Sequence, residues 1–380
     1  MTKGLSYRPN NLTLIFSGGG TGGHIYPAIA VADRIKELIP DVTVLFVGAV
    51  GKMEMTKVPQ HGYEIIGLWI SGLQRRLTFS NLLFPLKVIH SYLKSKSILK
   101  KVKPDVVTGF GGYASSPIML AASRNGIKTL VQEQNSYAGI ANKAVAKRAN
   151  TFCVAYDKMD RFFPESKIIL TGNPVRGNIS NQNADLTDAL NYFELNKTKE
   201  VILILGGSLG ARTINESIIQ NIQEWIDSDI QLIWQTGKLY YQEMLDRLPK
   251  HREGIHLIEF IDRMDLAYKA ADVVISRAGA LSISELCLVK KPVIFVPSPN
   301  VAEDHQTKNA KSLVEKNAAV MIEDKQAIKE LASVAIQLLS DNDKRAQLSD
   351  NIALLGKPQA TNDIAKEILK LAGVEVPLTP

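Results

Sequence analysis

Short apolar runs alternate along the whole chain with longer stretches whose apolar residues recur at helical spacing. The short runs, bounded by polar, Gly or Pro residues, predict buried strands, and the longer stretches predict amphipathic helices. Regular alternation of the two is typical of α/β folds with parallel sheets. We expect strands at residues 12–16, 42–47, 63–69, 105–109, 128–132, 151–155 and 167–171, and then at 201–205, 230–235, 255–259, 272–276, 292–296 and 318–322.

A polar, Asn-rich stretch separates the two series of strands. It shows little apolar periodicity apart from a short helix expected near residues 186–193. The 380 residues also exceed one ordinary domain of roughly 100–200 residues. We therefore expect an N-terminal domain over residues 1–176, a linker over 177–199, a C-terminal domain over 200–356, and a last helix in 357–380 that packs back on the first domain.

A run of glycines stands between the first predicted strand and the helix that follows it. Residues 17–23 read Ser-Gly-Gly-Gly-Thr-Gly-Gly, and His24 comes next. Glycine allows positive φ and lets a ligand approach the bare amides, which attract anions at the start of a helix. A second glycine loop, Gly206–Gly210, follows the strand expected at 201–205 in the same way. Two such junctions predict two Rossmann-like lobes.

The first loop also satisfies the G-x-G-x-x-G pattern of dinucleotide-binding oxidoreductases, through Gly18, Gly20 and Gly23. That fingerprint needs an acidic residue at the end of the second strand to hold the ribose. Here Gly48–Gly51 follows that strand, and the next acid, Glu54, already falls in the following helix. The pattern disfavours a nicotinamide or flavin enzyme without excluding one.

Polar residues follow two more strands of the first half, within Gly109–Tyr113 and Glu133–Asn135. Ligands of open α/β sheets gather outside the carboxyl ends of the strands. The plainer alternatives are helix capping for residues 133–135 and a helix-entry residue satisfied by the backbone for His24. We expect one cleft at this edge, lined by His24, Tyr113, Glu133 and Asn135.

In the second half, a tight turn at residues 278–280 precedes a predicted helix. The amides of its first turn would point at a diphosphate. Glu285 lies about one turn in, where a carboxylate can accept both ribose hydroxyls, although a capping box with Ser282 explains it equally well. Polar residues Asp304–Gln306 begin a later helix and suit sugar hydroxyls.

The net charge of +7 hides an asymmetry between the two halves. Residues 1–176 hold 23 Lys/Arg against 10 Asp/Glu, and the remaining residues hold 22 against 28. Residues 71–104 carry eight basic residues and no acid, mixed with large apolar side chains in their first part. Such composition favours a surface that lies on an anionic bilayer. Motifs for nucleic acid are lacking, so no nucleic-acid partner is expected, while an ordinary amphipathic helix accounts for part of residues 88–99.

The two cysteines, Cys153 and Cys287, indicate a reducing compartment without a disulfide framework. The apolar stretch behind Lys3 and Arg8 is too short for a signal peptide, and no uncharged run of about 18 residues predicts a membrane span. Two D-x-D runs lie away from the glycine loops and are interpreted as turns. We expect no metal site and no cofactor.

Seven motifs together make the sequence similar to glycosyltransferase family 28, the bacterial enzymes that add N-acetylglucosamine to undecaprenyl-pyrophosphoryl-N-acetylmuramyl-pentapeptide. The resemblance spans about residues 12–320 and implies a GT-B fold: two Rossmann-like lobes facing a deep cleft. It also implies an inverting, metal-independent transfer that forms a β-1,4 linkage. The motifs are Gly19–His24, Gly111–Tyr113, Glu133–Asn135, Gly172–Arg176, Gly206–Arg212, Gly279–Ser282 with Glu285, and Asp304–Gln306.

The resemblance assigns roles to individual positions. It implies that His24 assists deprotonation of the acceptor's C4 hydroxyl, with Glu133 and Tyr113 supporting acceptor placement. For the UDP-N-acetylglucosamine donor it implies contacts from Thr21, Gly22, Gly23, Asn135, Arg176, Ser208, Ile261, Ala280, Leu281, Ser282, Ile283, Ser284, Glu285 and Gln306. The lipid of the acceptor stays in the membrane, which would explain the basic and apolar composition of residues 71–104. The expected membrane contacts are Leu73, Arg75, Arg76, Leu77, Phe79, Leu82, Leu83, Phe84 and Lys87.

These assignments imply a peripheral, non-spanning enzyme on the cytoplasmic side of the inner membrane, with other cell-wall and division proteins as further partners. Three alternatives stay open. A related GT-B enzyme would act on another lipid such as diacylglycerol, a sugar-nucleotide epimerase would need no acceptor, and a dinucleotide oxidoreductase would bind NAD.

Overall fold

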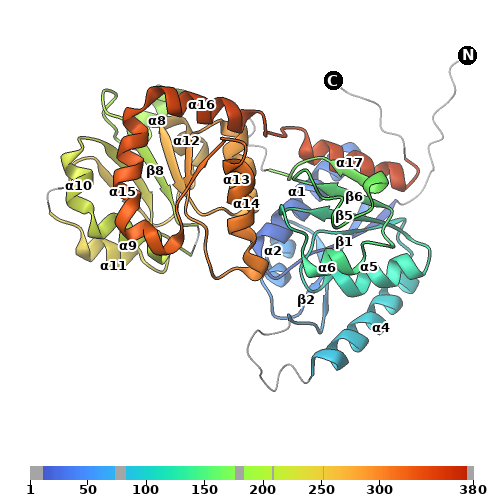
Figure 1. Ribbon diagram of the computed structural model, residues 1–380. Helices are drawn as coiled ribbons and strands as arrows, with labels where there is room; N and C mark the ends of the chain where they lie inside the picture. Colours follow the sequence, from blue (N-terminus) through green and yellow to red (C-terminus); the bar gives the residue numbers. More distant parts are fainter. Residues whose placement is uncertain (1–11, 73–82, 176–183, 208, 251, 375–380) are drawn as a thin grey trace, which may run out of the picture. The chain divides into compact units, whose positions relative to one another are not determined.

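The computed structural model describes residues 12–72, 83–175, 184–207, 209–250 and 252–374. The chain forms two compact units, residues 1–175 with 359–380 and residues 176–358 (Figure 1). Each unit is an α/β structure built on one parallel sheet. Every strand predicted from the sequence is present among the described residues, with ends that differ by two residues at most.

Unit 1 contains a seven-stranded sheet in the order β3-β2-β1-β4-β5-β6-β7. Strand β1 lies between β2 and β4. From β1 the chain builds the sheet toward β3 at one edge, and from β4 it builds the sheet toward β7 at the other edge. Such a reversal of strand order is where open α/β sheets bind ligands. The strands are β1 Thr13–Ser17, β2 Thr43–Ala49, β3 Glu64–Leu68, β4 Val106–Gly109, β5 Lys128–Glu133, β6 Thr151–Val154 and β7 Ile168–Leu170.

Alternate residues of β1 face two separate cores. Leu14 and Phe16 pack with helices α1 and α17, whereas Ile15 packs with α4 and α5. The fully buried Ile364 and Ile368 make α17, near the end of the chain, part of the core of unit 1 beside α1 (Figure 1). The helices of unit 1 are α1 Gly22–Leu38, α2 Glu54–Gln60, α4 Phe84–Val102, α5 Ser115–Arg124, α6 Ile140–Ala144, η1 Glu165–Lys167 and α17 Ala360–Leu371.

Unit 2 repeats the plan with a six-stranded sheet in the order β10-β9-β8-β11-β12-β13. The strands are β8 Val201–Leu205, β9 Gln231–Gln235, β10 Ile255–Ile258, β11 Val273–Ser276, β12 Val293–Phe295 and β13 Val320–Met321. The helices are α8 Leu186–Tyr192, α9 Arg212–Gln220, α10 Ile222–Asp227, α11 Tyr241–Arg247, α12 Met264–Ala270, α13 Ala280–Val289, η2 Ala302–Asp304, α14 His305–Val314, α15 Asp324–Ser340 and α16 Asn342–Ala353. The strand order places β8 where unit 1 has β1.

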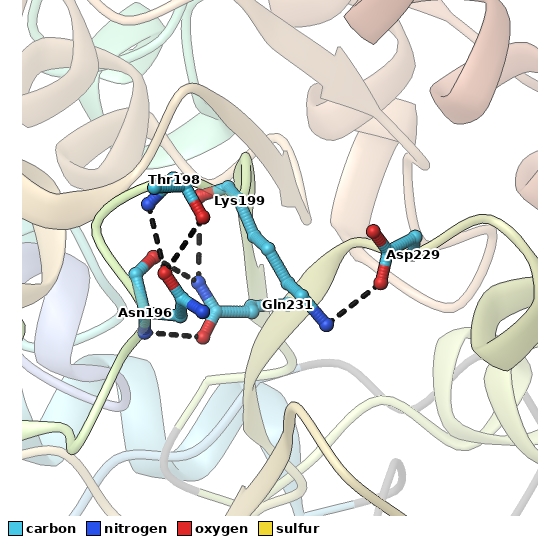
Figure 2. Close-up of polar contacts among 5 residues, drawn as sticks. All are labelled: Asn196, Thr198, Lys199, Asp229 and Gln231. Atoms are coloured by element: carbon cyan, nitrogen blue, oxygen red, sulfur yellow. Dashed lines mark hydrogen bonds and ion pairs between the residues drawn. The ribbon is translucent and has the colours of Figure 1, made fainter.

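The described part of the expected linker, residues 184–199, belongs to unit 2. Helix α8 packs on α12, and the segment after it is fixed to the start of β9 (Figure 2). There Gln231 Oε1 accepts from the Asn196 amide at 2.7 Å, Gln231 Nε2 donates to the Asn196 carbonyl at 2.9 Å, and Lys199 pairs with Asp229 at 2.7 Å. A buried side chain that pairs with both main-chain groups of Asn196 leaves this end of the segment little freedom.

Candidate functional site

Two glycine loops of unit 1 touch main chain to main chain at the carboxyl ends of β1 and β4. A Cβ on Gly112 would lie 2.2 Å from the Gly19 carbonyl oxygen, and Gly112 has φ +83. The Phe110 amide donates to the Ser17 carbonyl at 2.7 Å. Both the close approach and the positive φ require glycine at position 112. The contact fixes the shape of the first loop.

His24 lies in the first turn of α1 with its ring held by that loop. Its Nδ1 is 3.0 Å from the Gly19 carbonyl oxygen and 3.1 Å from Thr21 Oγ1. A carbonyl oxygen only accepts, so Nδ1 carries the proton and Nε2 keeps its lone pair. Burial lowers the pKa of His24, against the opposing effects of the Gly19 hydrogen bond and the charge of Glu54. The ring is therefore a neutral imidazole at pH 7 with Nε2 as the proton acceptor.

The N-terminus of α1 has no side-chain cap. Thr21 is its N-cap, with extended backbone and no side-chain hydrogen bond to the helix amides. Gly22 and Gly23 follow, so little side-chain bulk covers the first turn. The first-turn amides of an α-helix have no acceptor within the helix.

Glu133 is 1% exposed and uses its carboxylate inside its own loop. Oε1 accepts from the Asn135 amide at 3.0 Å, and Oε2 accepts from the Gly139 amide at 2.9 Å and from Asn142 Nδ2 at 2.8 Å. Burial raises the pKa of Glu133, while these hydrogen bonds lower it. With its oxygens used in this way, Glu133 holds Asn135 in place rather than offering itself to a ligand.

Tyr113, by contrast, is 48% exposed. Its ring covers Gly72, where a Cβ would lie 2.1 Å from Tyr113 Cζ, and a Cβ on Gly20 would be 3.9 Å from its ring. Tyr113 therefore stands at the surface beside the first glycine loop, at the edge where the sequence predicted it.

A chain of buried amide side chains, which the sequence did not reveal, joins the loops beneath the site. Gln132 Nε2 donates to Asn173 Oδ1 at 2.9 Å, Asn173 Nδ2 donates to the Gln134 carbonyl at 3.1 Å, and Gln134 Nε2 donates to the Phe110 carbonyl at 2.8 Å. Hydrogen bonds between buried polar groups make the surrounding structure rigid, although Gln134 Oε1 has no hydrogen-bond partner among the described residues. The network links the ends of β4 and β5 to the Gly172–Arg176 motif.

Unit 2 has its own pair of touching glycine loops, after β8 and β9. A Cβ on Gly210 would lie 2.2 Å from the Thr236 carbonyl oxygen, and one on Gly237 would lie 2.1 Å from the Gly210 nitrogen. Both residues also have positive φ, +91 and +80. The contact is again backbone on backbone.

Helix α13 follows β11, the strand that lies beside β8 in the sheet. Its N-cap is Gly279, which has extended backbone and makes no side-chain cap hydrogen bond. The capping-box alternative for Glu285 is wrong, because it requires Ser282 rather than Gly279 at the N-cap. The start of a ten-residue helix without a side-chain cap is suited to an anion.

The next two positions expected at the donor are already engaged. Ile283 is 2% exposed, and its amide donates to the Gly279 carbonyl at 2.9 Å. Ser284 Oγ donates to the Ala280 carbonyl at 3.0 Å. Only the first three residues of the helix have amides outside the helical ladder, because from the fourth onward the amides donate within the helix.

Glu285 is oriented by a tyrosine that the sequence reasoning missed. The Tyr268 hydroxyl donates to Glu285 Oε2 at 3.3 Å. Burial, together with the charge of Glu285, raises the pKa of Tyr268 well above its ordinary value. The hydroxyl stays protonated and serves as a fixed donor to the carboxylate.

Two further donor positions have one polar group occupied. The Ile261 amide donates to Gln235 Oε1 at 3.0 Å, and Gln306 Oε1 accepts from the Ser298 amide at 2.8 Å. Ile261 is 4% exposed, and its carbonyl oxygen and the Gln306 Nε2 group take no part in these two hydrogen bonds. Gln306 follows Glu303 and Asp304, whose φ values of +51 and +55 are left-handed and costly for residues other than glycine.

Several expected positions lie outside the described residues, namely Arg176, Ser208, Leu73, Arg75, Arg76, Leu77, Phe79 and Leu82. Of the other residues expected at the membrane, Leu83 is exposed, Phe84 is partly buried, and Lys87 Nζ donates to Ser71 Oγ at 3.0 Å. Helix α4 also exposes Leu86, Ile89 and Leu93, which the sequence reasoning did not single out. Their spacing of three and four residues places them on one face.

Within the part of the chain that the structure describes, no three His, Cys, Asp or Glu side chains gather as a metal site would need. The described helices also include none with the length and apolar character required to cross a bilayer.

Both halves of the chain match models of one family. Residues 14–154 match the glycosyltransferase family 28 N-terminal domain, and residues 201–368 match its C-terminal domain. A UDP-N-acetylglucosamine–N-acetylmuramyl-(pentapeptide) pyrophosphoryl-undecaprenol N-acetylglucosamine transferase of Flavobacterium psychrophilum is 53% identical over 94% of this chain and 97% of its own length. The protein of the same description from Cytophaga hutchinsonii is 52% identical over 95% and 97%. Among solved structures, Acinetobacter baumannii MurG has 27% identity and a TM-score of 0.78, covering 95% of this chain and all of its own.

Proposed function

The chain belongs to glycosyltransferase family 28, and on this premise we propose that it moves N-acetylglucosamine from UDP-N-acetylglucosamine to the C4 hydroxyl of undecaprenyl-pyrophosphoryl-N-acetylmuramyl-pentapeptide in peptidoglycan synthesis. The observation that carries the proposal is the near-full-length identity to relatives whose names state this reaction. Because the matched residues span both units, the proposal rests on the whole chain rather than on one shared domain. The GT-B fold follows from the same matches.

In the proposed reaction His24 acts as the general base. Its Nε2 accepts the proton of the C4 hydroxyl while the oxygen attacks the anomeric carbon, and UDP leaves from the opposite face. One displacement inverts the configuration and forms the β-1,4 linkage. A positioned base contributes about 10²–10⁴-fold to such a step. The neutral ring and its Nδ1 proton on the Gly19 carbonyl support this role, and Tyr113 supports acceptor placement.

The donor is assigned to unit 2. The first-turn amides of α13 hold the diphosphate and stabilise the charge that develops on UDP, so no metal ion is required. Glu285, oriented by Tyr268, accepts from the ribose hydroxyls. The Ile261 carbonyl accepts from the uracil N3–H, and Gln306 donates to the sugar. The family resemblance further assigns donor contacts to Thr21, Gly22, Gly23, Asn135, Arg176 and Ser208.

We assign the exposed face of α4 to the membrane, which makes the enzyme peripheral on the cytoplasmic side of the inner membrane. Leu86, Ile89 and Leu93 are 58%, 57% and 59% exposed. Lys96 and Lys100 are exposed on the same helix. A lipid surface accepts both the apolar and the basic side chains, and each basic residue near anionic lipid adds about 1 kcal/mol. Contact with other cell-wall and division proteins belongs to the same proposal.

Co-sedimentation with anionic and zwitterionic vesicles tests the membrane assignment. We expect Ile89→Ser with Leu93→Ser to reduce binding to anionic vesicles, and Leu354→Ser, at a position 79% exposed in unit 2, to leave it unchanged. Equal loss in both variants would reject α4 as the membrane face.

The reaction is tested with labelled UDP-N-acetylglucosamine and a short-chain lipid-linked muramyl-pentapeptide in the presence of a chelator. The proposal expects a disaccharide product with β configuration and no loss of rate on chelation. Product with diacylglycerol instead would indicate a transferase for another lipid. Conversion of the sugar nucleotide without an acceptor would indicate an epimerase, and NAD binding without product would favour an oxidoreductase.

A further inference from the structure

Glu54 is a carboxylate buried directly beneath the first glycine loop. It is the first residue of α2 and is 0% exposed. Its Oε2 accepts from the Gly20 amide at 3.0 Å, and its Oε1 accepts from the Ala49 amide at 3.0 Å. One side chain thus connects the loop after β1 with the end of β2. Hydrogen bonds to an ionised acceptor are about twice as strong as neutral ones.

The space for this carboxylate is made by two other glycines. A Cβ on Gly19 would lie 2.1 Å from Glu54 Oε1, and one on Gly48 would lie 2.6 Å from its Cγ. A buried charge is costly unless its partners are in place. The packing therefore holds the carboxylate in one position against the loop.

The two ends of one peptide group connect Glu54 to His24. The Gly20 amide and the Gly19 carbonyl belong to the same planar peptide unit, in which N–H and C=O point in opposite directions. Glu54 Oε2 accepts from the N–H at 3.0 Å, and the carbonyl oxygen accepts from His24 Nδ1 at 3.0 Å. A carboxylate bound to the N–H polarises the carbonyl and strengthens the hydrogen bond on its far side.

We propose that Glu54 is a positioning residue of the transfer reaction, acting on His24 through the Gly19–Gly20 peptide group. It fixes the plane of that peptide, keeps the proton of the ring on Nδ1, and leaves Nε2 directed to the acceptor hydroxyl. The inference rests on the proposed function, since it assumes that His24 is the base. It also accounts for the missing ribose-binding acid of the G-x-G-x-x-G pattern. Glu54, the acid nearest the end of β2, is hydrogen-bonded to the loop itself.

The test is Glu54→Gln, which keeps the shape of the side chain but turns one acceptor into a donor facing a backbone N–H. We expect kcat to fall about 10–100-fold, the equivalent of one charge-assisted hydrogen bond. We expect the KM for UDP-N-acetylglucosamine to change less than about twofold, because the proposed contacts with the diphosphate, the ribose and the uracil come from unit 2. The matched control is Glu64→Gln, the same change at an exposed glutamate of unit 1, and it should leave both constants unchanged.

Nitrogen-15 NMR of the histidine rings gives a readout that a merely structural role would not move. In the unsubstituted enzyme His24 should be the Nδ1–H tautomer, and in Glu54→Gln part of it should shift to Nε2–H. If Glu54→Gln does not fold, the unsubstituted enzyme still decides: an Nε2–H tautomer of His24, or a Gly20 amide that exchanges as fast as solvent-exposed amides, overturns the inference. Unchanged kcat and tautomer in a folded Glu54→Gln enzyme overturn it as well.

The two measurements separate this inference from the proposed function. A tautomer change on Glu54→Gln in an enzyme that gives no transfer product would reject the proposed reaction while Glu54 still set the state of His24. Normal transfer with an unaffected ring would reject Glu54 alone.

Discussion

The junctions β1–α1 and β8–α9 occupy equivalent places in the two sheets but are supported in different ways. In unit 2 the loop rests on another main chain, since Gly210 lies against Thr236 and Gly237. In unit 1 the loop meets Gly112 from one side and is hydrogen-bonded by a buried carboxylate, Glu54, from another. Support by a neighbouring main chain requires only that a glycine, which has no side chain, stand at the contact. Carboxylate support also carries a charge to the loop, and that loop is the one bearing His24.

The difference indicates that the two loops have different requirements. A loop that orients no titrating side chain can be packed backbone on backbone, with each glycine required for steric reasons. A loop that orients a titrating side chain gains from a charged support, because the charge acts on the protonation of the ring as well as on geometry. Four substitution or pH experiments sharpen this comparison.

The largest expected effect follows from His24→Ala. Removing the base should lower kcat about 10²–10⁴-fold while the KM for UDP-N-acetylglucosamine changes little. His61→Ala, at an exposed histidine of the same unit, is the control. Turnover near that of the unsubstituted enzyme would show that the loop of unit 1 does not carry the catalytic base.

The next effect concerns stability and should be shared by both junctions. Gly112→Ala and Gly210→Ala place a Cβ 2.2 Å from a carbonyl oxygen and should each cost about 2–4 kcal/mol of unfolding free energy. The controls Gly51→Ala and Gly207→Ala also have positive φ but open space around the added Cβ, so about 1 kcal/mol is expected. Urea unfolding followed by circular dichroism measures all four. If Gly112→Ala costs no more than Gly51→Ala, and Gly210→Ala no more than Gly207→Ala, the contact between backbones does not support the loops.

A smaller effect is expected for Tyr268→Phe in unit 2. Loss of the hydroxyl that orients Glu285 removes a hydrogen bond worth about 0.5–1.5 kcal/mol, so the KM for UDP-N-acetylglucosamine should rise about 2–10-fold. kcat should stay the same, because Tyr268 acts on donor binding alone. Tyr192→Phe, at an exposed tyrosine of unit 2, should leave KM unchanged. A change confined to kcat would mean that Glu285 takes part in the chemical step instead.

The smallest effect is a displacement of the pH profile. Burial lowers the pKa of His24 below its ordinary 6.5, so the base is neutral at pH 7 and activity should fall only as the pH drops below 6.5. The charge of Glu54 raises this pKa. Removing it in Glu54→Gln should therefore move the acidic limb of kcat to still lower pH, by less than about one unit. An acidic limb above pH 6.5, in enzyme that circular dichroism shows to be folded, would exclude His24 as its source.

Much of the fold could be predicted because its signals are local. Buried strands of parallel sheets are short apolar runs, and the glycines that follow β1, β4 and β8 mark turns that other residues cannot make. The edge of the sheet that carries His24, Tyr113 and Asn135 followed from the same reasoning. Ile283 illustrates the limit: the family resemblance implies a donor contact there, whereas the helical ladder takes its amide and the core takes its side chain.

By itself the sequence determined the alternation of strands and helices, the two glycine-loop junctions and the residues that belong to the family motifs. Each of these depends on neighbours in the chain. Only the tertiary structure decided which side chains support the site. Glu54 comes to lie under Gly20 because β1 and β2 are adjacent, and Tyr268 reaches Glu285 because α12 and α13 flank one strand. No regular spacing in the sequence connects the members of such pairs. The partner of a buried carboxylate can therefore be identified only when the folded sheet has brought the two residues together.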